Sequence, residues 1–187
     1  MQQAENVVPA RAVTILAVID TGYVKKTYPQ PGQDPEQPTV IDHASQFMLC
    51  SGSRGMIAGQ GTANLEFGAN IGDYVAFSGT SIYDNSDDAV IVYSVDYSRG
   101  KKVFNQFSPV LVTRDNAVMP DPDSETGTPP TSVSATFSSQ ESRVHTHGTG
   151  YYNLSFALYT LADDGETQEL FGYYRWASVI TVLNPHF

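Results

Sequence analysis

The sequence predicts an all-β protein: a single sandwich of about ten short antiparallel strands. Short apolar or alternating runs recur about every eight to fifteen residues, separated by turns rich in Gly, Pro, Asn and Asp. No run has both the length and the period of an amphipathic helix. Only 16% of the residues are charged, against roughly 25% in most soluble proteins. Ser, Thr, Asn and Gln must therefore supply much of the surface, as is typical of β-rich chains.

The first predicted strand, residues 12–19, is apolar on both faces, which indicates a central position in a sheet. It ends at Asp20 and is followed by a loop over residues 22–38. Because proline donates no backbone hydrogen bond, no regular ladder is expected in this loop. A loop of this length is typically functional or mobile. Its prolines are Pro29, Pro31, Pro35 and Pro38.

The later strands follow from alternation and turn residues. Gly79 indicates a bulge, and Pro109 indicates that the strand over 107–112 lies at a sheet edge. Residues 114–130, with four prolines, predict a second irregular loop. In the run 131–139, Val133, Ala135 and Phe137 face one way and serines and a threonine face the other. The strands after the first are expected at 46–50, 63–67, 74–82, 89–97, 107–112, 131–139, 141–147, 151–161, 169–176 and 178–183.

Length and charge limit the possible functions. The 187 residues fit one domain, expected over 11–187 after an N-terminal tail at 1–10. The net charge of -10 disfavours nucleic acid and anionic membranes as partners, since both attract basic patches. No secretory signal and no apolar run long enough to span a bilayer is present in the sequence, so a cytoplasmic protein is expected.

The stretch from residue 20 to 43 is the candidate binding loop, through Asp20, Tyr28, Asp34, Asp42 and His43. Carboxylates near a histidine can perform acid–base chemistry, so a hydrolase using Asp20, Asp42 and His43 is one hypothesis. The structural alternative is that Asp20 and Asp42, each at the edge of an apolar strand, accept hydrogen bonds from turn N–H groups. We favour the structural alternative, and the sequence contains no recognisable catalytic motif.

Aromatic residues crowd the C-terminal part of the chain. Tyr and Trp are enriched at ligand and subunit surfaces, so Tyr151, Tyr173 and Trp176 are the candidate aromatic surface. The alternative is that about half of the aromatic residues there belong to the core.

Metal binding has two weak candidate sites. His145 and His147 stand two residues apart, so on a strand both imidazoles would point to the same face. Asp121 and Asp123 belong to an acidic loop of the kind that can bind Ca²⁺. Neither site has a complete ligand set, and solvated polar residues explain both. We therefore predict no metal and no cofactor.

Four stretches are distinctive in sequence, order and spacing: VTILAVIDT at 13–21, YPQPGQDPEQPTVIDH at 28–43, GQGTANLEFGANIGDYVAFSGTSI at 59–82 and FGYYRW at 171–176. Together they resemble the PixA/AidA family of bacterial inclusion-body proteins over nearly the whole chain. The second stretch is the most specific. One departure concerns the family's Asp-Pro after the last tryptophan, because Trp176 is followed here by Ala177 and Ser178.

The resemblance implies an immunoglobulin-like β-sandwich and a cytoplasmic protein that accumulates in inclusions, with expression tied to quorum sensing or secondary metabolism. The family has no established enzymatic activity, so no catalytic residues are transferred. Our first hypothesis is a non-enzymatic protein that forms homo-oligomers. The alternative is a carbohydrate-binding module, possible with or without Ca²⁺, that uses the loops around Asp34 and Asp121 and has Trp176 as its platform.

Overall fold

Strand β1 (Ala12–Ile19) lies inside a sheet, as its apolar pattern predicted. The computed structural model describes residues 10–185, so the predicted tail lies, except for Ala10, outside the described residues. Every second side chain of β1, from Val13 to Ile19, is fully buried. The strand pairs antiparallel with β3 (Gln46–Ser51) and parallel with β6 (Tyr74–Ser81). On its other face, Ala12 and Thr14 are exposed and Leu16 and Val18 are half-buried.

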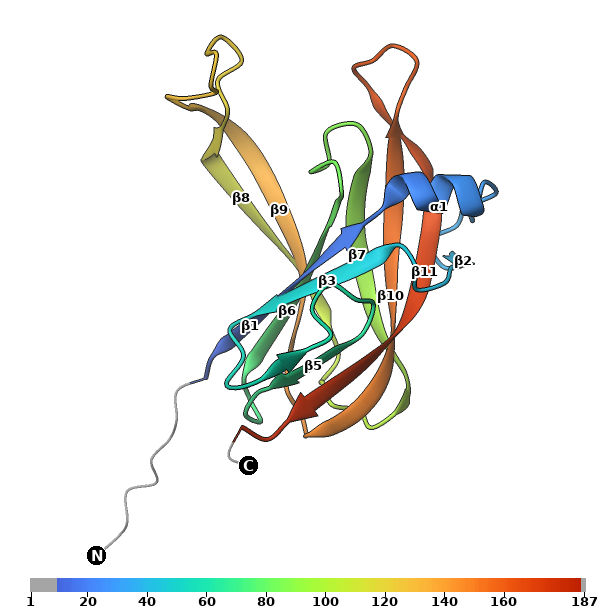
Figure 1. The fold of residues 1–187 in the computed structure, drawn as a ribbon, viewed down its shortest axis with the longest axis vertical. Helices are drawn as coiled ribbons and strands as arrows, with labels where there is room; N and C mark the ends of the chain where they lie inside the picture. Colours follow the sequence, from blue (N-terminus) through green and yellow to red (C-terminus); the bar gives the residue numbers. More distant parts are fainter. Residues whose placement is uncertain (1–9, 186–187) are drawn as a thin grey trace, which may run out of the picture.

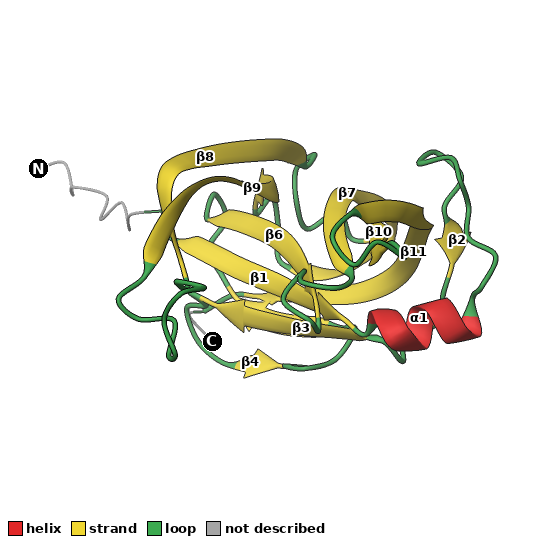
Figure 2. Cartoon of the chain, turned by 90° about the horizontal axis from the view of Figure 1, so that it is seen from above, coloured by secondary structure: helices red, strands yellow, loops and turns green. Residues whose placement is uncertain are grey.

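Two sheets form the described part of the chain (Figures 1 and 2). Sheet A has the order β3-β1-β6-β9-β8, with β9 (Thr131–Arg143) and β8 (Ser108–Met119). Sheet B has the order β4-β5-β11-β10-β7, and β2 pairs with β11. The predicted all-β sandwich is confirmed. Most pairings are antiparallel, but β1 with β6, and β11 with both β2 and β5, are parallel. The strands of sheet B are β2 (Thr39–Val40), β4 (Ile57–Ala58), β5 (Leu65–Gly68), β7 (Ala89–Gly100), β10 (Gly148–Leu161) and β11 (Gln168–Leu183).

The core between the sheets is rich in aromatic side chains. Phe77 of sheet A meets Phe104 edge-on, with ring centroids 6.5 Å apart. Phe156 of sheet B lies between Tyr174 and Trp176, at 5.6 and 5.8 Å. Burial of one such side chain stabilises the fold by about 1.5–3 kcal/mol. The largest fully buried side chains are Trp176, Tyr152, Tyr174, Phe67, Phe77, Phe104 and Phe156.

A short helix, α1 (Thr21–Thr27), begins where the sequence predicted a loop. The carboxylate of Asp20 caps it by accepting a hydrogen bond from Tyr23 N at 2.9 Å. Val24 is buried in the core, and Lys25 Nζ lies 2.7 Å from Asp88 Oδ1. Seven residues are too few for a periodic apolar pattern, so the tertiary contacts of Val24 and Lys25 decide the conformation. No helix among residues 10–185 is long and apolar enough to cross a membrane.

Strand limits differ from the prediction in the second half of the chain. Strand β8 continues to Met119, so the predicted irregular loop at 114–130 is wrong for its first part. The strands expected at 131–139 and 141–147 are largely the single strand β9, and the last two predicted strands are the single strand β11. The edge position expected from Pro109 is confirmed, since β8 is the last strand of sheet A.

Gly79 does not mark a bulge, because β1 and β6 pair through it without a change of register. It allows close approach of the two sheets instead. A Cβ atom added at Gly79 would lie 2.4 Å from Cγ2 of Val92 on β7. The lack of a side chain at Gly79 therefore allows sheet A to pack closely on sheet B.

Candidate functional site

The polar residues of the candidate binding loop hold the loop itself together. Asp20 caps α1, and Asp42 accepts hydrogen bonds from Ala44 N at 3.0 Å and from the Tyr23 hydroxyl at 2.9 Å. The bond from Ala44 N is the main reason that the pKa of Asp42 lies below its usual value. The Tyr28 hydroxyl accepts a hydrogen bond from Asp42 N at 3.0 Å. These contacts match the structural alternative given for Asp20 and Asp42.

His43 is exposed, and its side chain makes no hydrogen bond or ion pair within residues 10–185. Asp34 accepts a hydrogen bond from Glu36 N at 2.9 Å, which closes a turn in the proline-rich segment, residues 29–38. A general base needs a partner that orients it and a proton within reach. The described contacts of Asp20, Asp42 and His43 supply no such arrangement for the hydrolase hypothesis.

The proline-rich segment lies on the outer face of sheet B. Gly32 pairs with Tyr173 of β11, and the Tyr173 N–H donates to Gly32 O at 2.8 Å. The Tyr93 hydroxyl of β7 donates to Pro35 O at 2.7 Å. The segment is therefore attached to two strands of sheet B and forms a wall over its outer face.

The candidate aromatic surface divides between the two faces of the sheet. Trp176 is 0% exposed, so its prediction as a surface residue and as a sugar platform is wrong. Strand β11 alternates without a shift here, which turns Tyr174 and Trp176 to the core and Tyr173 outward. Tyr173 meets Tyr93 edge-on at 5.7 Å. Tyr151 is also partly exposed, with the Arg99 guanidinium 4.4 Å from its ring centroid.

The residues proposed as weak metal ligands make separate local contacts and do not form a common site. His147 Nε2 lies 2.9 Å from Ala69 O, whereas His145 is exposed. Asp121 accepts a hydrogen bond from Asp123 N at 3.0 Å within the β8–β9 loop. In the part of the chain that the structure describes, no three His, Cys, Asp or Glu side chains gather where they could hold a metal ion.

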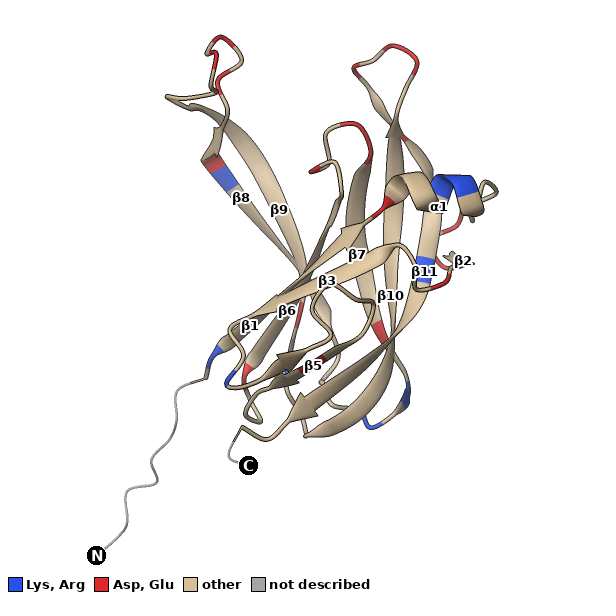
Figure 3. Ribbon diagram, viewed as in Figure 1, with Lys and Arg blue, Asp and Glu red and all other residues tan. Residues whose placement is uncertain are grey.

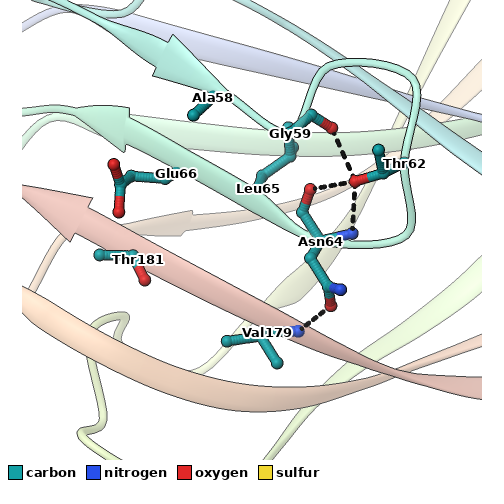
Figure 4. Close-up of a pocket in the computed structure, with 8 residues that line it drawn as sticks. All are labelled: Ala58, Gly59, Thr62, Asn64, Leu65, Glu66, Val179 and Thr181. Carbon is teal, nitrogen blue, oxygen red and sulfur yellow. Dashed lines mark hydrogen bonds between the residues drawn. The ribbon is translucent and has the colours of Figure 1, made fainter.

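A cavity of about 230 Å³ lies beside β5 and β11 (Figure 4). Polar groups that line it form hydrogen bonds with one another in and beside the neighbouring turn. Thr62 Oγ1 donates to Asn64 O at 2.8 Å, and Asn64 Oδ1 accepts from Val179 N at 2.7 Å. The nearby Cys50 is buried, and burial raises the pKa of its thiol to about 11. A thiol of that pKa is not a nucleophile near neutral pH.

The most unusual surface is the β8–β9 ribbon, defined as strands β8 and β9 up to Ser139. Strand β9 pairs with β6 only over residues 140–143, so beyond them β8 and β9 pair with each other alone. Figure 1 shows the ribbon leaning away from the other strands. Two strands by themselves are marginally stable in water.

One face of the ribbon is mostly apolar, although Arg114 stands opposite Ala135 on it. The register sets Val112 opposite Phe137 and Ala117 opposite Val133, with Met119 farther out on the same face. Phe137 is 57% exposed. The alternation predicted for residues 131–139 is therefore present, but its apolar side faces solvent rather than the core. The other face carries mostly Ser and Thr, together with Leu111 and Val118, each 70% exposed.

Comparison with known proteins identifies the family. A sequence profile of the PixA inclusion body proteins matches residues 11–182, which is most of the chain. The chain belongs to the PixA inclusion body protein family. The PixA inclusion body protein from Burkholderia cenocepacia J2315, which has a crystal structure, shares 34% sequence identity with this chain. The two structures match with a TM-score of 0.81. The similarity covers 96% of this chain and 100% of the other. Among curated proteins, none matches the chain. The resemblance seen in the sequence is thus confirmed, and PixA proteins are not a known enzyme family.

Proposed function

We propose that this PixA family member is a non-enzymatic cytoplasmic protein whose copies associate through the β8–β9 ribbon. The observation that carries the proposal is the apolar face around Phe137, on a ribbon with no third strand. Large exposed apolar patches on soluble proteins mark interaction sites. A location in the cytoplasm and expression linked to quorum sensing stay predictions from the family resemblance.

The edge of the ribbon supports association as well. Strand β8 is twelve residues long, lies at the end of sheet A and contains the β-favouring run Val110–Val112 with Thr113. Its outer N–H and C=O groups can pair with a strand of another chain. Pro109 blocks pairing only near its first residue. An added strand would satisfy these groups, and its side chains would flank those of β8 on the apolar face.

The charges of the ribbon favour a second copy as the partner. The chain carries -10, which makes copies repel one another. The strands of the ribbon are neutral overall, because Arg114 balances Asp115. In an antiparallel β8–β8 pair about a twofold axis, Arg114 of each copy would lie near Asp115 of the other.

The ends of the ribbon are complementary in the same arrangement. The loop between β8 and β9 contains Asp121, Asp123 and Glu125, and the loop that leads from β7 into β8 contains Lys101 and Lys102. Figure 3 shows acidic residues at the upper loop tips, and basic residues at the lower end of the molecule as well as on α1, β8 and β11. An antiparallel pair of ribbons would set the acidic tip of one copy beside the basic base of the other, which stabilises the pair at low salt.

Sedimentation velocity over a wide concentration range tests the proposal. We expect the mean mass to rise above the 20.3 kDa of one chain as concentration increases. Added salt should weaken the association, since it screens the attraction between tip and base. A strict monomer at every concentration would contradict the proposal. An association constant that does not change with salt concentration would contradict the arrangement in which the tip of one ribbon lies beside the base of the other.

A further inference from the structure

A second cavity, of about 260 Å³, lies on the outer face of sheet B under the proline-rich segment. Its floor is a row of polar side chains across three adjacent strands. The register sets Ser155 of β10 between Ser94 of β7 and Arg175 of β11. Asp96 completes the floor, and Glu36 belongs to the wall formed by the segment.

A β-bulge adds Tyr93 to this floor. The pairing of β7 with β10 shifts register between Val92 and Ser94, so Tyr93 and Ser94 both escape the core face. The Tyr93 hydroxyl then reaches Pro35 O at 2.7 Å. Burial and the nearby carboxylates of Glu36 and Asp96 are among the causes that raise the pKa of Tyr93, so this hydroxyl stays protonated and able to donate.

The wall over the floor is attached at several points. Gln33 Nε2 donates to Phe171 O at 3.0 Å, and Gly32 N donates to Thr39 Oγ1 at 2.8 Å. The two prolines in the wall, Pro35 and Pro38, fix their own φ angles. A cavity with a held wall requires little ordering when a ligand enters, which favours binding.

Arg175 contributes a guanidinium to this cavity. Its guanidinium is partly buried and makes no hydrogen bond, ion pair or ring contact within residues 10–185, although Asp96 and Glu36 line the same cavity. A guanidinium can only donate and a carboxylate can only accept. A ligand that bridges them must therefore offer both acceptors and donors within a small volume.

We propose that this cavity binds a small polyhydroxylated molecule, a monosaccharide or polyol. Each hydroxyl both donates and accepts, so neighbouring hydroxyls can accept from Arg175 and donate to Asp96 or Glu36. Tyr93 donates its proton to Pro35 O and Ser94 donates to Asp96, so their hydroxyl oxygens, with that of Ser155, can accept from a ligand in the same space. The volume lies just below the roughly 300–1,000 Å³ typical of drug-sized ligands, which suits one sugar ring. This site lies on sheet B and does not depend on association through the ribbon.

Saturation-transfer NMR with a panel of free neutral monosaccharides and polyols tests the site. We expect transfer to at least one compound from the unmodified chain, and at least a tenfold weaker affinity for that compound in Arg175→Met and Asp96→Asn. Thr181→Ala, on the same outward face of β11 but in the other cavity, is the matched control and should bind normally. Near-ultraviolet circular dichroism checks that each variant keeps its core.

Three results would overturn the proposal. The first is a panel in which no compound receives saturation. The second is binding that Arg175→Met and Asp96→Asn leave unchanged. The third is binding only of free α-amino acids in a parallel panel, because the cavity would then select a zwitterion rather than hydroxyl groups.

Discussion

Phe137→Ser is expected to weaken association of the protein at least tenfold. Phe137 is the largest side chain of the apolar ribbon face and is 57% exposed in the single chain. Burial of such a side chain contributes about 1.5–3 kcal/mol. A twofold dimer would lose it from both copies, and every 1.4 kcal/mol or so is a factor of ten in the dissociation constant. Sedimentation velocity of the variant and the unmodified chain measures the difference.

Leu111→Ser is the matched control for this prediction. Leu111 belongs to the same ribbon and is more exposed than Phe137, but it points to the opposite face. We expect its replacement to change the dissociation constant much less. Equal weakening by the two variants would show that the face around Phe137 is not the one that partners cover.

Asp73→Ala is expected to lower the free energy of unfolding by about 3–5 kcal/mol, the range for a buried ion pair that loses one partner. The carboxylate of Asp73 is nearly fully buried and lies 2.5 Å from Arg54 Nε. It also accepts hydrogen bonds from Arg11 N and Asn70 N, both at 2.8 Å. The carboxylate therefore ties the start of β1 to the loop before β6. Urea unfolding followed by tryptophan fluorescence measures the loss, and the exposed Asp163→Ala should change stability little.

The same carboxylate predicts a dependence of stability on pH. Burial alone would raise the pKa of Asp73, but hydrogen bonds from Arg54, Arg11 and Asn70 outweigh it and leave the pKa below the usual 3.8. As the pH falls below about 4, the unfolded chain therefore binds a proton before the folded chain does, and stability declines. Asp73→Asn should show a shallower decline over this range. A decline as steep as that of the unmodified chain would contradict the assignment.

Sequence periodicity located most of the fold because alternation reports which side chains are buried. It succeeded for β1, and for Pro109 as an edge residue. It also grouped Val133, Ala135 and Phe137 on one face, but alternation does not tell whether such a face covers a core or is exposed to solvent. The prediction that Trp176 lies at the surface was wrong, although the alternation along the strand sets Trp176 on the same face as Tyr174, which is the core face.

The cavity on sheet B could not be predicted for a different reason. Its floor depends on the bulge at Tyr93, and nothing in the local run of apolar residues indicates an extra residue there. Its wall depends on a contact from Tyr93 to Pro35, 58 residues earlier in the chain. In the stretch around Arg175, only the neighbouring aromatic residues indicated a possible binding surface. Long-range contacts of this kind are absent from local sequence patterns.

Hydrogen–deuterium exchange at several protein concentrations tests most directly whether the β8–β9 ribbon is the surface through which copies associate. We predict that amides of β8, residues 108–119, become more protected as concentration rises, because a second copy pairs with their open edge. Strand β7, an edge strand of sheet B, should keep the same exchange at every concentration. Exchange of β8 that does not change with concentration, or new protection on β7 instead, would contradict the account.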